Sequence, residues 1–338
     1  MNKLFIITNE SVYSKENNFY CDNLDQKITP EELSKFFEIE LITRSSRIKR
    51  FHLINLKNIN PCKNIVSFLT KVYRATKIEN SKYLIISITP YTFLTVVLLK
   101  LLKKKPIVYL RSDGFGEYKA ILGIFGHLIY KIMFSIVSKF SKFISCEEYI
   151  LKGKNGSLVK PSHLRNSWVS KPQAADSSKP NLLYVGRIKV EKGIFSLINM
   201  LKNYDREFFL NIVGSSPNDK IISHKNIKVN EIETEENKLI KIYDKSNIFI
   251  LPSFTEGHPL VLYESLARLR PIIVFEDIKH VKKGYEGIFI SKRNLKSLSN
   301  TIDYILQNYE GIQNKMKNNK LVTNKEFIEE FKDLVIKL

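Results

Sequence analysis

The fold is decided by one segment, Leu182-Leu183-Tyr184-Val185-Gly186-Arg187-Ile188-Lys189-Val190-Glu191-Lys192-Gly193. Its apolar start predicts a buried strand that ends at Gly186, and a helix is expected to begin near Gly193. Such a strand, loop and helix aim backbone N–H groups and the positive helix end at one point. Arg187 and Lys192 add two cations there, which suits a diphosphate. The alternative is that both are ordinary surface cations near a helix start.

Short apolar runs alternate with helix-period stretches along the whole chain, which is typical of parallel strands joined by crossover helices. The first half predicts strands at 3–8, 39–43, 83–88, 107–110, 143–145 and 157–160, and helices at 62–77, 91–103 and 117–140. The second half predicts strands at 182–185, 208–213, 227–229, 248–251 and 272–275, and helices at 193–203, 234–245, 259–268 and 295–308. Residues 161–180, rich in serine and proline, are expected to be a linker.

The chain of 338 residues is long enough for about two domains. We therefore expect an α/β protein with two Rossmann-like, doubly wound domains. Sheets of this kind bind ligands outside the carboxyl ends of their strands, so the two domains are expected to face each other across a cleft.

The chain is strongly basic, with 54 Lys and Arg against 34 Asp and Glu and a formal net charge of +20. Residues 1–170 carry most of it, with 27 basic and 13 acidic side chains. This charge indicates an anionic partner: nucleic acid, an anionic membrane surface or a phosphate-bearing substrate. The three cysteines, Cys21, Cys62 and Cys146, have neither disulfide-framework nor metal spacing and fit a reducing compartment.

Two segments raise the question of a membrane. The apolar stretch 84–102 is interrupted by Ser87, Pro90 and Lys100, so it predicts a strand, a turn and a helix rather than a span. No export signal is expected at the start of the chain. The stretch 112–146 mixes apolar residues with lysines, and we favour a core helix there over a helix that contacts a membrane.

A second segment with candidate chemistry runs from Pro252 to Glu264. The strand 248–251 ends at Pro252, Gly257 permits an unusual turn, and Pro259 is well placed to start a helix. Glu256 then lies in the loop and Glu264 lies about one and a half turns into the helix. We expect the two carboxylates to grip hydroxyl groups on different parts of one extended ligand. The alternative is a capping acid and a solvent-facing Glu264.

These segments carry a resemblance. Tyr184-Val185-Gly186-Arg187 with Glu191-Lys192-Gly193, then Ile212-Val213-Gly214, then Ile250-Leu251-Pro252-Ser253 with Glu256-Gly257, Pro259 and Glu264-Ser265-Leu266-Ala267 resemble the C-terminal domain of retaining family 4 glycosyltransferases of the GT-B fold, the glycosyl transferases group 1. The resemblance covers roughly residues 181–290. A weaker one rests on the apolar run 83–110 followed by Arg111-Ser112-Asp113-Gly114.

The resemblance implies which residues hold a nucleotide-diphosphate sugar. Arg187 and Lys192 would hold the diphosphate, Glu256 the donor sugar, and Glu264 the ribose. The implied donor-binding set also contains Gly186, Gly214, Gly257, His258, Pro259 and Leu260. Asp113 and Gly114 are candidates on the acceptor side. No metal or other cofactor is implied, in agreement with the absence of an Asp-x-Asp motif.

The resemblance further implies a division of labour between domains. Residues 1–165 would bind the acceptor, 166–322 the donor, and the helix 323–338 would cross back to the first domain. A metal-independent hexosyltransferase of this kind would extend a lipopolysaccharide, capsule or O-antigen glycan, or a lipid-linked acceptor. It would work in the cytoplasm, at the inner face of the membrane, with an anionic membrane surface as a further partner.

The chain departs from the family pattern at two places. It has Thr8-Asn9-Glu10-Ser11 where members commonly have a glycine-rich loop, and Asp113-Gly114 where many have a His-Gly pair. We expect His258 to offer its backbone amide, and His127 and His163 to be structural.

Two other functions remain open. One is a basic nucleic-acid-binding protein, which we do not expect because the lysines are spread widely and no reading motif occurs. The other is a sugar-nucleotide epimerase of the same fold. A dinucleotide oxidoreductase is disfavoured because no Gly-x-Gly-x-x-Gly follows a strand.

Overall fold

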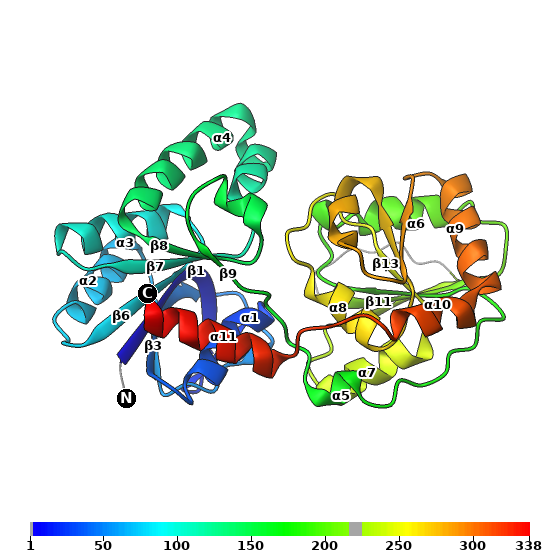
Figure 1. The fold of residues 1–338 in the computed structure, drawn as a ribbon, viewed down its shortest axis with the longest axis horizontal. Coiled ribbons are helices and arrows are strands. Elements are labelled where there is room, and N and C mark those ends of the chain that lie inside the picture. Colours follow the sequence, from blue (N-terminus) through cyan, green and yellow to red (C-terminus); the bar gives the residue numbers. More distant parts are fainter. Residues whose placement is uncertain (1–2, 216–224) are drawn as a thin grey trace. The chain divides into compact units, whose positions relative to one another are not determined.

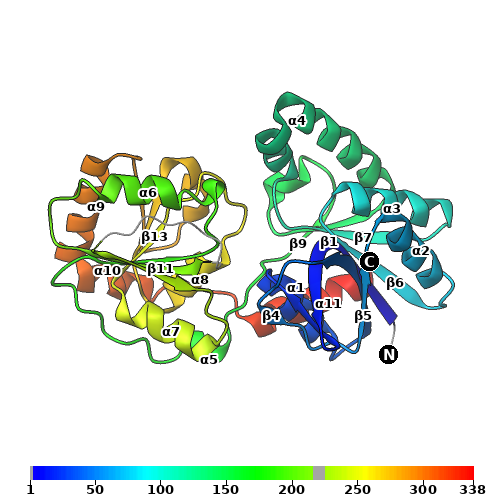
Figure 2. The same ribbon diagram turned by 180° about the vertical axis from the view of Figure 1, so that it is seen from behind.

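The computed structural model describes residues 3–215 and 225–338. The chain forms two compact units, Met1–His163 with Asn324–Leu338, and Leu164–Thr323. Each unit is a sheet of mainly parallel strands with helices on both faces (Figures 1 and 2). The expected pair of doubly wound α/β domains is confirmed.

The main sheet of the first unit is parallel, and the first strand of the chain lies in its interior. In spatial order the strands are β5 (Asn58–Cys62), β3 (Glu38–Ser46), β1 (Lys3–Lys15), β6 (Ser81–Ile86), β7 (Pro106–Leu110), β8 (Lys142–Ser145) and β9 (Ser157–Leu158). The chain runs outward from β1 in both directions, so the strand order reverses between β1 and β6. The six predicted strands are present, and β5 is additional.

Strand β1 is longer than predicted. It passes through Thr8-Asn9-Glu10-Ser11, where its pairing with β3 shifts register between Ile7 and Ser11, as in a β-bulge. It then turns at Glu16 and Asn17, both with positive φ, into the antiparallel β2 (Asn18–Cys21), which pairs with β4 (His52–Leu53). The segment Thr8-Asn9-Glu10-Ser11 is therefore part of a continued strand.

The helices of the first unit are α1 (Leu24–Leu33), α2 (Ile65–Ala75), α3 (Pro90–Leu101), α4 (Gly114–Phe140) and α11 (Asn324–Lys337). The starts of α2 and α3 are defined by capping boxes at Asn64 and Thr89. The apolar stretch 84–102 is the end of β6, a turn and α3, as predicted. Helix α11 packs Phe331 against the ring of Tyr109 on β7, with 4.8 Å between the ring centroids.

Helix α4 corrects the core-helix interpretation of the stretch 112–146. Its second half buries Tyr130, Met133, Phe134 and Val137, but the segment 119–125 is exposed throughout. Gly123 has φ 63° and ψ −146°, so the helical path is broken there. Within the described part of the chain, α4 is the helix long and apolar enough to cross a membrane by length and composition. The core-helix interpretation therefore holds for the face that carries Tyr130 to Val137 and is wrong for residues 119–125.

The sheet of the second unit is entirely parallel. In spatial order its strands are β12 (Ile227–Glu231), β11 (Phe209–Ser215), β10 (Asn181–Val185), β13 (Ile248–Leu251), β14 (Ile272–Phe275) and β15 (Ile288–Ser291). The five predicted strands are present, and β15 is additional. The strand order reverses between β10 and β13, the position at which doubly wound sheets bind ligands.

The helices of this unit are α5 (Asn166–Val169), α6 (Ile194–Leu201), α7 (Glu236–Lys245), α8 (Leu260–Ala267), α9 (Leu295–Gln307) and α10 (Tyr309–Met316). A short 3₁₀ turn, η2 (Val190–Lys192), precedes α6. The four predicted helices correspond to α6, α7, α8 and α9.

The expected linker 161–180 is mostly bound to the second unit. Arg268 donates to the carbonyl oxygens of Trp168 and Ser170 at 2.9 and 2.8 Å, and Arg270 donates to that of Gln173 at 2.8 Å. Both arginines are buried, and Arg268 pairs with Asp244 at 2.8 Å. The boundary between the two units lies inside the expected linker. The residues after it are held by the second unit because buried guanidinium groups satisfy the backbone of a segment that has no apolar periodicity.

Candidate functional site

Two glycines bring the ends of β10 and β11 into close approach. The N–H of Gly186 donates to the carbonyl oxygen of Val213 at 2.9 Å. Gly214 has φ 124°, and a Cβ there would lie 2.3 Å from the Gly186 carbonyl oxygen. Only glycine fits at Gly214, so β10 and β11 present bare backbone at their carboxyl ends.

The loop after β10 is fastened directly to the loop after β13. Gly193 has φ 67°, and a Cβ on it would lie 1.9 Å from the carbonyl oxygen of Pro252. Next to it, the N–H of Phe254 donates to the carbonyl oxygen of Glu191 at 3.0 Å. The two segments singled out from the sequence therefore form one structure at the carboxyl edge of the sheet.

Lys192 and Glu256 meet at this junction. The Nζ of Lys192 lies 2.7 Å from Oε1 of Glu256, and the Ser253 hydroxyl donates to the same oxygen at 2.6 Å. The two charged side chains are 23% and 9% exposed, so the pair is largely shielded from water. Two donors on one oxygen hold the carboxylate in a single orientation.

Arg187 lies at the same strand end but, unlike Lys192, it is not held by a carboxylate among the described residues. Its side chain is exposed, and among residues 3–215 and 225–338 its guanidinium forms no ion pair. Its carbonyl oxygen accepts from the Tyr184 hydroxyl at 2.8 Å. Burial raises the pKa of Tyr184, and the charge of Glu256 raises it further. The Tyr184 hydroxyl therefore stays protonated and donates its hydrogen bond to the backbone of Arg187.

Arg293, just after β15, supports the loop that carries Glu256. It donates to the carbonyl oxygens of Pro252 and Ser253 at 2.9 and 3.2 Å and pairs with Asp277 at 2.7 Å. Its guanidinium also lies 4.1 Å from the centroid of the Phe254 ring. Sequence reasoning missed Arg293 because it missed β15.

Glu264 occupies a separate environment on α8. It is 5% exposed, and its Oε2 accepts from the hydroxyl of Tyr243 on α7 at 2.8 Å. Burial raises the pKa of Tyr243, and the Glu264 carboxylate raises it further, so the phenol stays a donor. The solvent-facing alternative for Glu264 is therefore wrong. Glu256 and Glu264 have different partners and are not a pair that shares one proton.

The loop before α8 contains the other expected donor-site residues. Pro259 stands at the N-cap position and Leu260 begins the helix, one residue later than the expected start at 259. The ring of His258 stacks on that of Tyr263, with 4.7 Å between centroids. Gly257, His258 and Pro259 thus precede the helix start, where its first N–H groups lack intrahelical partners.

In the first unit, Asp113 and Gly114 have evident roles in the fold. Asp113 caps α4 by accepting from the N–H of Phe115 at 3.2 Å, and it lies 3.4 Å from Nζ of Lys152. A Cβ on Gly114 would lie 2.1 Å from the ring of Tyr130, so a glycine is required for packing alone.

A charge cluster that sequence reasoning missed lies at the same edge. Asp25 at the start of α1 contacts Arg111 after β7 and also the ring of His163. Burial opposes the charge of Arg111, but the acidic groups around it, led by the Asp25 carboxylate, together outweigh burial and raise the pKa of Arg111. The adjoining cavity has a volume of about 20 Å³, room for about one water molecule. These residues are far apart in the chain, so their spacing in the sequence does not indicate that they meet.

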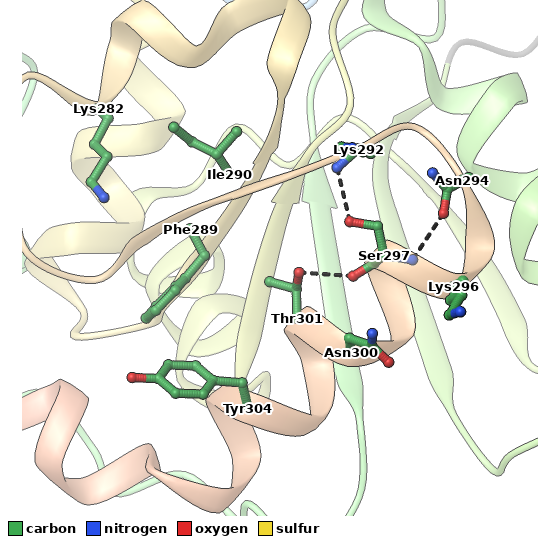
Figure 3. A pocket seen from close by; sticks show the side chains of 10 residues that line it. All are labelled: Lys282, Phe289, Ile290, Lys292, Asn294, Lys296, Ser297, Asn300, Thr301 and Tyr304. Carbon is green, nitrogen blue, oxygen red and sulfur yellow. Dashed lines mark hydrogen bonds between the residues drawn. The ribbon is translucent and has the colours of Figure 1, made fainter.

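A larger pocket of about 690 Å³ lies over β15 and α9 (Figure 3). Lys282, Lys292 and Lys296 are among its lining residues, but none of the expected site residues is. Its polar groups serve the helix start: Ser297 N–H donates to Asn294 Oδ1 at 2.9 Å, and Lys292 N–H donates to Ser297 Oγ at 3.0 Å. We therefore place the candidate site at the β10–β13 switch point and not in this pocket.

Comparison with known families decides the identity of the second unit. Residues 166–322 match the model of the family described as glycosyl transferases group 1. The second unit is a glycosyl transferases group 1 domain. Among the described residues of the chain, no group of three or more His, Cys, Asp or Glu side chains could hold a metal ion.

Individual relatives of the group 1 domain are distant. The chain is 29% identical over 160 residues to an uncharacterized glycosyltransferase of Haemophilus influenzae, covering 43% of this chain and 44% of the relative. It is 25% identical over 148 residues to the Campylobacter jejuni N,N'-diacetylbacillosaminyl-diphospho-undecaprenol alpha-1,3-N-acetylgalactosaminyltransferase, covering 41% of this chain and 39% of the relative. The chain thus spans less than half the length of either relative.

Solved structures resemble the chain over nearly its whole length. Anabaena HepE in complex with UDP-glucose superposes with a TM-score of 0.68 at 10% identity, covering 99% of this chain and 98% of that one. This likeness concerns the fold, which is GT-B, as the resemblance implied.

Proposed function

We propose that the protein is a retaining glycosyltransferase of the hexosyltransferase type. It moves a sugar from a nucleotide-diphosphate sugar to a hydroxyl group of a cell-surface glycan or lipid-linked acceptor. The observation that carries the proposal is the Lys192–Glu256 pair, held at the strand switch point of a group 1 domain. Such a point is where an open α/β sheet binds its ligand.

The donor would lie along the carboxyl edge of the second unit. Arg187 and Lys192 supply positive charge for the diphosphate, and the bare backbone at Gly186 and Gly214 lets it approach closely. Glu256 accepts hydrogen bonds from hydroxyls of the donor sugar, and Glu264 accepts them from the ribose. Gly257, His258, Pro259 and Leu260 offer the N–H groups that open α8.

The main task of the protein in this reaction is to stabilise the negative charge on the departing diphosphate. The bond between the anomeric carbon and the diphosphate oxygen breaks, the bond to the acceptor oxygen forms on the same face, and the acceptor proton passes to the diphosphate. Arg187 and Lys192 offset the charge that develops on the diphosphate, so the proposed reaction needs no metal. Holding the acceptor in place supplies the rest.

The acceptor class is supported by the relatives and by charge. The Campylobacter relative carries a diphospho-undecaprenol acceptor in its name. The first 170 residues, with 27 basic and 13 acidic side chains, suit an anionic or lipid-linked acceptor at the inner face of the cell membrane. Polysaccharide synthesis of the lipopolysaccharide, capsule or O-antigen kind fits this setting, with Asp113 and Gly114 near the acceptor. No observation favours nucleic-acid binding or epimerase activity.

The proposal is tested by following product formation from UDP-, GDP- and ADP-sugars with polyprenyl-linked acceptors. NMR of the product gives the configuration at the anomeric carbon, which should match that of the donor. Glu256→Ala and Lys192→Ala should each lower turnover. Wild-type rates in both variants would refute the site, and inversion at the anomeric carbon would refute the retaining mechanism.

A further inference from the structure

Helix α4 exposes an unusual amount of apolar surface. Six of its apolar side chains are more than half exposed, at 52–81%. We call this set the α4 apolar face: Ile121, Leu122, Ile124, Phe125, Leu128 and Ile132. Soluble monomers rarely expose so many large apolar residues together, and such patches mark binding surfaces.

The break at Gly123 turns this surface into an apex. Residues 121–125 are exposed throughout, and a Cβ added at Gly123 would have no other atom within 4 Å. A Cβ on Gly126 would lie 2.0 Å from the carbonyl oxygen of Tyr118, so the two helical segments pack closely behind the apex. Within the first unit, α4 forms an outer edge in both views (Figures 1 and 2). The apex is therefore built into the fold.

Length and composition alone would let α4 cross a bilayer, but its packing argues against this. Tyr130 and Phe134 are buried in the core of the first unit, beside Phe143 of β8. A spanning helix would have to leave that core. The exposed side chains between Ile121 and Ile132 instead form a face long enough to lie in the interface of one leaflet.

The chain segment that contains α4 is strongly basic. Residues 100–142 contain nine Lys and Arg against two acidic residues, Asp113 and Glu117. Lys119 and Lys131 flank the apex in the sequence and are exposed, and Nζ of Lys100 lies 4.8 Å from the Phe140 ring centroid at the far end. If a second copy covered the face across a two-fold axis, these lysines would be brought together, which costs free energy. Anionic lipid headgroups complement them.

We propose that the α4 apolar face inserts into the headgroup and acyl boundary of an anionic lipid bilayer, with the surrounding lysines on the phosphates. Asp113 caps the same helix, so docking brings the acceptor-side residues of the first unit to the bilayer surface. This last step rests on the proposed function: the acceptor is a lipid-anchored glycan that is reached without leaving the membrane.

The test uses the full-length protein and sedimentation with vesicles of phosphatidylcholine, with or without phosphatidylglycerol. The variant Ile124→Glu/Phe125→Glu places two carboxylates on the apex, where both side chains are about four-fifths exposed, so folding should be unaffected. The control is Val66→Glu, which places a carboxylate on α2 of the same unit at a side chain that is 70% exposed and lies outside the α4 apolar face. Circular dichroism and thermal unfolding verify the fold of each variant.

We expect binding to vesicles with phosphatidylglycerol, weaker binding in high salt, and release from the vesicles by carbonate. The apex variant should bind at least about tenfold more weakly, whereas Val66→Glu should bind as the wild type does. Equal binding by the apex variant, or resistance to carbonate extraction, would overturn the proposal. So would a wild-type dimer in lipid-free solution that the apex variant dissociates.

Failure here is distinguishable from failure of the proposed function. Release of nucleoside diphosphate from a nucleotide sugar in lipid-free solution depends on the second unit and should be equal in wild type and apex variant. If that release persists while vesicle binding is absent, the membrane surface is refuted and the transferase stands.

Discussion

Nζ of Lys192 lies 2.7 Å from Oε1 of Glu256, and together they join the loop after β10 to the loop after β13. The pair joins positions 64 residues apart in the chain at the strand switch point of the second unit. A cation and a carboxylate held in one place suit a ligand that carries both a diphosphate and sugar hydroxyls.

Replacing Lys192 should impair catalysis far more than replacing its neighbour in the same turn. Lys192→Ala removes positive charge from the departing diphosphate, so kcat/KM for the donor should fall by about 100-fold or more. Lys189→Ala, at an exposed position at the start of η2, should change it less than about threefold. Steady-state kinetics with a saturating acceptor measure both, and equal losses in the two variants would rule out a specific role for Lys192.

Gly193 should be indispensable for joining the two loops. Gly193→Ala adds the strain of a positive φ, about 1–2 kcal/mol, and overpacking against Pro252 of about 1–3 kcal/mol. Gly284→Ala has a similar φ of 77° with open space around the Cβ, so it isolates the strain alone. Urea unfolding should show the larger loss for Gly193→Ala. Equal losses would mean that the contact with Pro252 is unimportant.

Glu264 should act in nucleotide binding and Tyr243 in positioning it. Glu264→Gln keeps the shape but removes the charge, and nucleotide affinity should fall by about tenfold or more. Tyr243→Phe removes only the 2.8 Å hydrogen bond to Oε2 and should have a smaller effect on affinity. Isothermal titration with the nucleotide diphosphate measures both. Unchanged affinity in Glu264→Gln would exclude the ribose role.

The buried Arg268 should stabilise the second unit strongly. Arg268→Ala leaves Asp244 without this partner and frees the backbone of residues 168–171, so unfolding free energy should fall by about 3–5 kcal/mol. The control is Arg206→Ala, which breaks an ion pair to Asp303 with an arginine that is 58% exposed and should cost less than about 1 kcal/mol. Similar denaturant midpoints for the two variants would contradict the role of Arg268.

His52 should make the stability of the protein depend on pH. Burial, assisted by the charge of Lys27, lowers its pKa from 6.5 to about 4. Between these values the unfolded chain binds the proton and the folded protein does not, so stability is full above pH 6.5 and is lost as the pH falls toward 4. His52→Gln should lose less stability than the wild type when denaturant unfolding is compared above and below this window. The same loss in both proteins would show that His52 is not responsible.

Much of the fold was predictable because local patterns agree with the tertiary structure. The apolar runs at 248–251 and 272–275 coincide with β13 and β14, since strands buried on both faces are continuously apolar. Helix α1 was not predictable, because Pro30 lies inside it and its buried residues include Gln26 and Thr29. Nor was the exposure of Ile124 and Phe125, because an apolar helix has the same composition whether it packs in a core or projects from it.

The candidate site was predictable as a set of residues but not as contacts. The turn chemistry of Gly193 and Pro259 placed both loops at strand ends. That Lys192 would pair with Glu256, and that Tyr243 would bond Glu264, depends on pairings between distant elements. Arg293 and the cluster of Asp25, Arg111 and His163 lie in the same category, because packing alone brings them together.

The central claim, a nucleotide-diphosphate sugar at the β10–β13 edge, is tested most directly by thermal unfolding with UDP-, GDP- and ADP-sugars. Bound donor stabilises the folded state by mass action. We predict that at least one nucleotide sugar raises the unfolding midpoint of the wild type and of Lys189→Ala but not that of Lys192→Ala. An equal rise in Lys192→Ala, or no rise with any nucleotide sugar in the wild type, would contradict the account.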